Sequence, residues 1–129
     1  MSMNEDRAAA LRRDLEALME SESCIRSLLL ATPDGRCIQA IMPEMESRNK
    51  IAAMASSILA VAEKMAEFEG TGSCRQLLIE GTDGFATLRR ISKSLVLVLT
   101  LDRTGNLGFL SHFTRQCEKI VISHIKAKA

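Results

Sequence analysis

The chain has 129 residues, of which 47% are hydrophobic, and this is enough apolar material for one domain with a sizeable core. Its 17 basic and 16 acidic residues nearly cancel, and it contains no Trp or Tyr, so it lacks the basic surface and the aromatic platform that nucleic-acid binding uses. The N-terminal residues contain no apolar signal core, and the longest strand-like apolar run is too short to span a bilayer. We therefore expect a single domain over residues 1–129 that is cytoplasmic, without a membrane span and without a nucleic-acid partner.

The first third of the sequence predicts a helix followed by a β-hairpin. Leucines at helical spacing indicate an amphipathic helix that begins after Ser2, a candidate capping residue, and ends near Glu20. Residues 25–31 and 36–42 are two apolar runs separated by residues 32–35, a turn that contains both Pro and Gly. Such a pattern is typical of two antiparallel strands joined by a tight turn.

The most informative segment is a long helix predicted from about Arg48 to Glu69. Its apolar residues sweep an arc of roughly 200°, about twice the width that a one-sided surface helix needs. We expect the large side chains of this arc to pack on the chain's own sheet, and the small-residue strip Ala53, Ser57 and Ala60 to face a partner. The alternative, in which the chain itself covers the whole helix, stays open.

Three short strands are predicted in close succession, at residues 74–80, 85–91 and 95–101. Their connections are too short for parallel crossovers, so the three strands should form an antiparallel meander. Residues 95–101 do not alternate between apolar and polar, which indicates a central strand that is covered on both faces. A last helix follows the turn at residues 102–105, with Asn106 as the candidate N-cap.

The expected fold is therefore α/β in the α+β sense, a three-layer sandwich with the element order α-β-β-α-β-β-β-α. A five-stranded antiparallel sheet lies between the long helix on one face and the N- and C-terminal helices on the other. The turns between these elements are short, and no linker, repeat or low-complexity segment divides the chain.

Residue types that carry catalysis or bind metals are present, but they do not form a recognisable motif. No C-x-x-C occurs and no His lies at zinc-ligand spacing from a Cys, so we interpret the cysteines as free, small, buried hydrophobes. His124 falls on the apolar arc of the last helix, where a structural histidine is the commoner case. The four cysteines are Cys24, Cys37, Cys74 and Cys117.

The charged residues and glycines also have ordinary structural explanations. The loop at residues 69–74 joins a helix to a strand, which is the reverse of the order that aims backbone N–H groups at a phosphate. Arg89 and Arg90 could contact an anion, a partner or solvent, and their role is open. We expect no catalytic residue, no metal and no cofactor. The glutamates interpreted as solvated charges are Glu44, Glu46, Glu63, Glu67 and Glu69.

The element order, the helix segment I-A-A-M-A-S-S-I-L-A-V-A-E-K and the G-N-L-G at residues 105–108 together resemble the Roadblock family. That family includes dynein light chains and bacterial regulators of Ras-like GTPases, and the resemblance covers roughly residues 11–125. It implies a homodimer in which the third strands of two subunits pair edge to edge while the long helices meet on one face. It also implies that this face engages a small GTPase and alters its nucleotide cycle, and that the G-N-L-G is a structural turn.

Carried onto this sequence, the resemblance places a dimer or partner interface on the long helix and the third strand. The function that it implies is a non-enzymatic, homodimeric regulator or scaffold of a small Ras-like GTPase. Three alternatives remain: a small-molecule-sensing module, a structural adaptor of a larger assembly, and a thiol enzyme. The predicted interface residues are Ala53, Ser56, Ser57, Ala60, Lys64, Cys74, Arg75, Gln76, Leu77 and Leu78.

Overall fold

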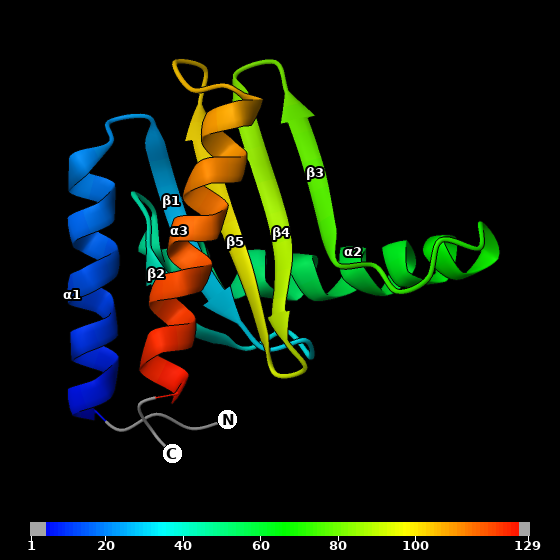
Figure 1. The fold of residues 1–129 in the computed structure, drawn as a ribbon, viewed down its shortest axis with the longest axis horizontal. Coiled ribbons are helices and arrows are strands. Elements are labelled where there is room, and N and C mark those ends of the chain that lie inside the picture. Colours follow the sequence, from blue (N-terminus) through cyan, green and yellow to red (C-terminus); the bar gives the residue numbers. More distant parts are fainter. Residues whose placement is uncertain (1–4, 127–129) are drawn as a thin grey trace.

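The computed structural model describes residues 5–126, and its elements follow the predicted order (Figure 1). The possible capping residue Ser2 lies outside the described part of the chain. The only addition is a short 3-10 turn before the long helix, among the elements that the structure describes. The elements are α1 (Glu5–Ser21), β1 (Ile25–Ala31), β2 (Cys37–Ile41), η1 (Met45–Ser47), α2 (Arg48–Phe68), β3 (Gln76–Gly81), β4 (Gly84–Ser92), β5 (Leu95–Asp102) and α3 (Leu107–Lys126).

The five strands form one antiparallel sheet in the order β2-β1-β5-β4-β3. The non-alternating strand β5 is central, as its sequence predicts, and the five residues from Leu95 to Leu99 are all buried. β2 and β3 form the two edges of the sheet. This order leaves one side of the β3 backbone without a neighbouring strand in the chain, which is a feature that proteins cover or pair.

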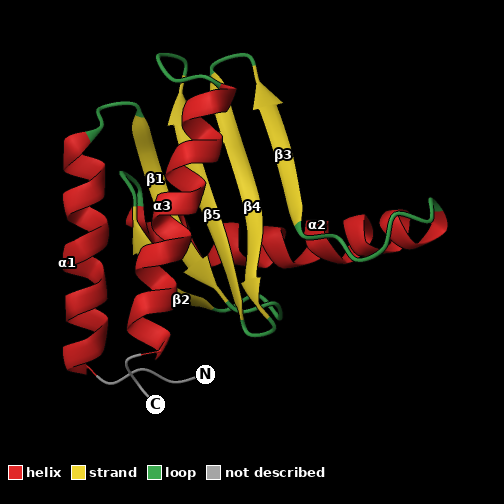
Figure 2. Cartoon of the chain, in the orientation of Figure 1, coloured by secondary structure: helices red, strands yellow, loops and turns green. Residues whose placement is uncertain are grey.

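Two hydrophobic cores lie on opposite faces of the sheet. Figure 2 shows the helices that cover them, with α1 and α3 on one face of the sheet and α2 on the other. Along β5 the side chains alternate between the two faces, so the leucines enter one core and the valines the other. The three predicted layers are therefore confirmed. The core beneath α1 and α3 includes Leu11, Leu15, Leu28, Leu30, Leu97, Leu99, Leu101, Leu110, Phe113, Cys117 and Val121, and the core beneath α2 includes Leu29, Ala31, Ala40, Ala52, Ala55, Leu59, Leu88, Val96 and Val98.

The helix α2 is longer than the sheet is wide. Figure 1 shows it crossing behind the strands and continuing past β3, so that its C-terminal half overhangs the edge of the sheet. The helix ends at Phe68 with Glu69 as its C-cap, and the next residue, Gly70, has a φ of 73°, the left-handed conformation that commonly follows a helix C-cap. The chain then returns to start β3, and this segment lies alongside the last turns of α2.

The β1–β2 turn docks on the N-terminal half of α2. Gly35 has a φ of 97°, and a Cβ at this position would lie 3.4 Å from both the Ala53 Cα and the Ser56 Cβ, so glycine fits both the conformation and the space. The Ser56 Oγ donates a hydrogen bond to the Pro33 carbonyl oxygen at 2.6 Å. The predicted interface residue Ser56 therefore already has a partner within its own chain.

The residues that precede α3 and α2 differ as helix caps. The predicted N-cap Asn106 caps α3, because its Oδ1 accepts a hydrogen bond from the Phe109 N–H at 2.9 Å. Ser47 precedes α2, but its side chain makes no capping hydrogen bond. The turn η1 leads directly into α2 and places Ser47 in a helical conformation, which is not the extended conformation of an ordinary N-cap.

Candidate partner interface

The exposed side of α2 carries a line of large apolar side chains, which we call the apolar seam: Met54, Ile58, Val61, Met65 and Phe68. Their exposed fractions rise toward the overhanging end, from 38–47% at Ile58 and Met54 to 90% at Phe68. They recur at alternating intervals of four and three residues, the spacing that brings side chains into a helix–helix contact. Exposed patches of this kind mark sites of protein–protein contact.

The prediction that the large side chains of α2 pack on the chain's own sheet is wrong for these five residues. The buried residues of α2 are Ala52, Ala55 and Leu59, so a mostly small-residue face lies on the sheet. Small side chains let the helix lie close to the strands, and the overhang removes the sheet from beneath the C-terminal half of the helix. The small-residue strip Ala53, Ser57 and Ala60 is exposed as well.

The edge strand β3 adjoins this helix and is largely exposed along its length. Leu77 is its one half-buried residue and packs against the core beneath α2, whereas Leu78 and Ile79 are 46% and 41% exposed. Of the remaining predicted interface residues, Arg75 and Gln76 are exposed and Cys74 is half-buried. The structure therefore places Gln76, Leu77 and Leu78 on the free sheet edge, whereas Cys74 and Arg75, which were also predicted on this strand, precede it.

An apolar groove joins the seam to the sheet. It has a volume of about 190 Å³, below the roughly 300–1,000 Å³ of typical small-molecule sites. Met54 and Ile58 form one wall, and Ile79 of β3 contributes from the edge strand. Helix, groove and strand edge thus form one continuous apolar surface. The full lining is Ile51, Met54, Ala55, Ile58, Ile79, Ala86, Leu88, Val98 and Thr100.

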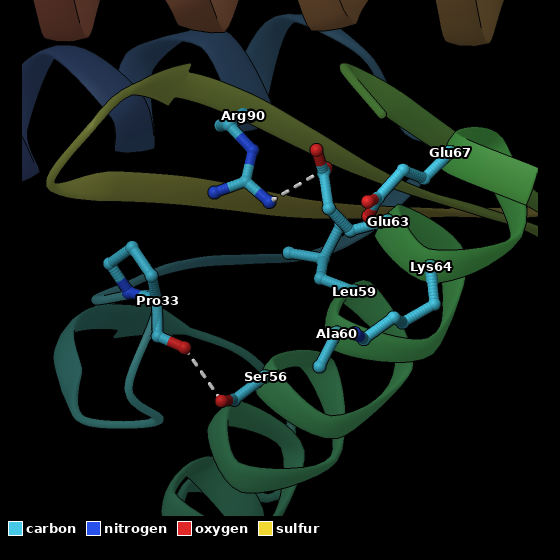
Figure 3. Close-up of a pocket in the computed structure, with 8 residues that line it drawn as sticks. All are labelled: Pro33, Ser56, Leu59, Ala60, Glu63, Lys64, Glu67 and Arg90. Carbon is cyan, nitrogen blue, oxygen red and sulfur yellow. Dashed lines mark hydrogen bonds and ion pairs between the residues drawn. The ribbon is translucent and has the colours of Figure 1, made fainter. Parts of the chain in front are cut away.

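A second pocket of about 290 Å³ lies on the other flank of α2 (Figure 3). It brings together three of the predicted interface residues, Ser56, Ala60 and Lys64, beside the turn residue Pro33. Its remaining lining residues are Leu59, Glu63, Glu67 and Arg90. The pocket is open and carries charges of both signs, which suits contact with a polar protein surface.

Two arginines whose role was open join the sheet to helices on opposite faces. The Arg89 Nε lies 3.2 Å from the Glu118 Oε1 on α3, and the Arg90 Nη2 lies 3.7 Å from the Glu63 Oε2 on α2. Successive strand residues point to opposite faces, which is why neighbouring arginines reach different helices. The interpretation of Glu63 as a solvated charge is therefore wrong, since its carboxylate is engaged within the fold.

The sequence of this chain matches the model of the Roadblock/LC7 domain over residues 12–101. The chain belongs to the Roadblock/LC7 domain family. It is 31% identical over 97 residues to the uncharacterized protein MJ1340 of Methanocaldococcus jannaschii, an alignment that covers 74% of this chain and 84% of that protein.

Solved structures share the fold of this Roadblock/LC7 domain at low sequence identity. Myxococcus xanthus MglB matches with a TM-score of 0.84 and 14% identity, over 100% of this chain and 97% of that one. The gliding protein MglB of Thermus thermophilus matches with a TM-score of 0.80 and 16% identity, over 98% and 96%. A structure of MglB with a tetrameric arrangement matches with a TM-score of 0.82 and 16% identity, over 96% of each chain.

The cysteines of this Roadblock/LC7 domain are free thiols, but only Cys24 and Cys117 are buried. Cys37 and Cys74 are half-buried, so the prediction of four buried hydrophobes is wrong for these two. Burial raises the pKa of Cys37, raises that of Cys117 to about 12, and together with nearby carboxylates raises that of Cys24. A nucleophilic thiol needs a lowered pKa, so these three sites do not favour a thiol enzyme.

This difference in burial predicts the order in which the thiols of the folded protein are alkylated. At pH 8 we expect N-ethylmaleimide to modify Cys37 and Cys74 well before Cys24 and Cys117, because the reactive thiolate must be both formed and accessible. Peptide mapping by mass spectrometry over a time course measures the order, and the same reaction in urea, where all four should react alike, is the control. Rapid modification of Cys117 in the folded protein would contradict the packing described for α3.

His124 has a structural contact in this Roadblock/LC7 domain. The His124 Nε2 lies 2.7 Å from the Asp14 Oδ2 and joins α3 to α1, in keeping with the structural role predicted for it. Within residues 5–126 no three His, Cys, Asp or Glu side chains are grouped so that they could hold a metal ion. No helix in this described range is long and apolar enough to cross a membrane.

Proposed function

We propose that this chain is a non-enzymatic, homodimeric regulator or scaffold of a small Ras-like GTPase, acting in the cytoplasm through protein–protein contacts. The observation that carries the proposal is the apolar seam on α2, a helix that crosses the free edge of β3 and continues past it. Membership of the Roadblock/LC7 family supports it, because the family resemblance implies pairing through these same two elements. The fold shared with MglB is consistent with it.

The overhang of α2 suits pairing with a second copy. A two-fold axis perpendicular to the sheet at the free edge of β3 would pair two β3 strands antiparallel and keep both α2 helices on one face. The overhanging half of each helix would then lie over the sheet of the other copy, beside the groove that contains Ile79. This arrangement would cover Val61, Met65 and Phe68, and it would satisfy the open edge of the sheet.

In such a dimer the outward side of the paired helices remains free for a GTPase. The exposed residues Ala53, Ser57 and Ala60 have short side chains, so this side of the helix is nearly flat. Lys64 adds a charge at the pocket shown in Figure 3. A platform of small side chains lets another protein approach the helix backbone closely. We therefore assign the predicted small-residue strip to the GTPase and the apolar seam to the second copy.

The proposal is tested with purified proteins. Small Ras-like GTPases from the same genome are loaded with GDP or with a non-hydrolysable GTP analogue, and their binding to this chain is measured by interferometry. Hydrolysis and nucleotide release are then followed with and without the chain, since binding that leaves both rates unchanged indicates a scaffold. We expect one GTPase to bind in a nucleotide-dependent manner. A stable monomer at micromolar concentration, or no binding to any GTPase in either state, would refute the proposal.

A further inference from the structure

The start of the edge strand is fastened to α2 and to β4 by one group of polar contacts, which we call the Glu63 cluster: Glu63, Cys74, Arg75 and Arg90. The Glu63 Oε2 accepts a hydrogen bond from the Cys74 N–H at 2.9 Å. The same oxygen lies 3.7 Å from the Arg90 Nη2, and Figure 3 shows this ion pair. The Arg90 Nε donates to the Cys74 carbonyl oxygen at 3.4 Å, and the Arg90 N–H donates to the Arg75 carbonyl oxygen at 2.9 Å. One carboxylate and one guanidinium therefore hold both backbone groups of Cys74.

Apart from the Glu63 cluster, the contacts that hold β3 within the chain come mainly from β4: the antiparallel ladder over residues 76–81, a hydrogen bond from the Thr87 Oγ1 to the Leu77 carbonyl oxygen at 3.2 Å, and one from the Arg89 Nη1 to the Gln76 Oε1 at 3.1 Å. The β3 backbone is paired on one side only, with β4, and Leu77 is the one residue of the strand that is not exposed. The chain reaches the strand from the overhanging end of α2 through exposed residues that include Gly70 and Gly72, both in left-handed conformations. An edge strand with so little buried side-chain surface is expected to open locally at a low free-energy cost. The contact of Glu63 with Cys74 therefore ties the start of the strand to α2, which the contacts with β4 do not.

The Glu63 cluster also connects the two surfaces on which the proposed dimer depends. Glu63 lies on α2 between Val61 and Met65 of the apolar seam, and Cys74 leads directly into β3. A two-fold contact needs the helix and the strand edge in one fixed mutual arrangement, since both must meet their counterparts together.

We propose that Glu63 and Arg90 are positioning residues that hold the edge of β3 in place relative to α2, so that a second copy can pair with both elements at once. This inference rests on the proposed homodimer and assigns to it two polar residues outside the apolar seam. Their effect is pre-organisation: when the pair is broken, the strand and the helix must be ordered during association, which weakens the dimer.

The chain offers a matched control on the opposite face of the sheet. Glu118 pairs with Arg89, the neighbour of Arg90, at 3.2 Å, and the side chains of Arg89 and Glu118 are 26% and 20% exposed, against 30% and 38% for those of Arg90 and Glu63. The carboxylate of Glu118 reaches β4 from α3, whereas that of Glu63 reaches it from α2. Glu63→Gln and Glu118→Gln thus remove the same charge from comparable ion pairs on different elements.

The experiment compares these two variants with the native chain. Dimer dissociation constants are measured by sedimentation, and amide hydrogen exchange is followed in residues 76–81. We expect Glu63→Gln to raise the dissociation constant about tenfold and to speed exchange in β3, because a hydrogen bond to a charged group is replaced by a neutral one. Glu118→Gln should change both quantities less than about twofold. Glu63→Ala, which also removes the acceptor for the Cys74 N–H, should have a larger effect than Glu63→Gln.

The outcomes separate this inference from the proposal on which it rests. A native chain that stays monomeric would overturn both. A native dimer in which Glu63→Gln and Glu118→Gln act alike, or in which exchange of the β3 amides is unchanged by Glu63→Gln, would overturn the positioning role alone. Urea unfolding of all variants shows whether a loss of dimer merely follows a loss of fold.

Discussion

Replacing Val61 by Glu is expected to convert the proposed dimer into a folded monomer. Val61 is 65% exposed and lies at the centre of the apolar seam, so the carboxylate is solvated in the single chain and costs its fold little. In the dimer the same group would be buried against apolar side chains, and two-fold symmetry introduces it twice. We expect the dissociation constant to rise by roughly 100-fold or more, measured by light scattering over a dilution series.

Two further variants test whether the loss of the dimer is specific to a charge on the apolar seam. Ser111→Glu adds the same charge to an exposed position on α3, on the opposite side of the sheet, and should leave the dimer intact. Ser57→Arg places a charge on the small-residue strip and should weaken GTPase binding while the dimer persists. If Ser57→Arg dissociates the dimer and Val61→Glu does not, the surfaces of α2 have been assigned the wrong way round.

The elements of this fold are predictable because their signals are local. The non-alternating run of β5 requires cover on both faces, and the turn before Asn106 needs only neighbouring residues to begin α3. The position of the interface, in contrast, is not determined by the local sequence. Both flanks of α2 are apolar, and which one lies on the sheet depends on where the helix crosses the strands and how far it extends beyond them. The four-and-three spacing from Met54 to Phe68 is the signal in the sequence that identifies the exposed flank.

The polar contacts, like the interface, cannot be predicted from the local sequence. Glu63 and Arg90 are far apart in the sequence and meet only because β4 lies beside the strand that follows α2. Alternation along β4 predicts that Arg89 and Arg90 point to opposite faces, but it does not identify a partner for either. Glu63 and Glu67 are both glutamates near the C-terminal end of α2, and the local sequence does not distinguish them. Only the path of the chain gives the carboxylate of Glu63 a partner and leaves that of Glu67 in solvent.

The side of α2 that faces the sheet should control the free energy of unfolding of the chain and not its association with a second copy. Leu59 is 3% exposed and packs in the core between α2 and the sheet, whereas Met65, less than two turns away, is 64% exposed. Leu59→Ala should lower the free energy of unfolding by about 2–5 kcal/mol, since it leaves a cavity that the sheet cannot fill. Met65→Ala should change the unfolding of a monomer by less than about 0.5 kcal/mol.

The measurement is urea unfolding with Val61→Glu as the common background, because a monomer gives a midpoint that does not depend on protein concentration. In the native background we expect Met65→Ala to have the larger effect on the dimer dissociation constant, because it weakens the dimer contact directly. Leu59→Ala should weaken the dimer only to the extent that it unfolds the chain. Equal losses of stability from the two substitutions would mean that Leu59 is not the residue that holds α2 on the sheet. A larger loss from Met65→Ala would mean that the overhanging half of α2 folds back onto its own chain, which leaves no seam for a second copy.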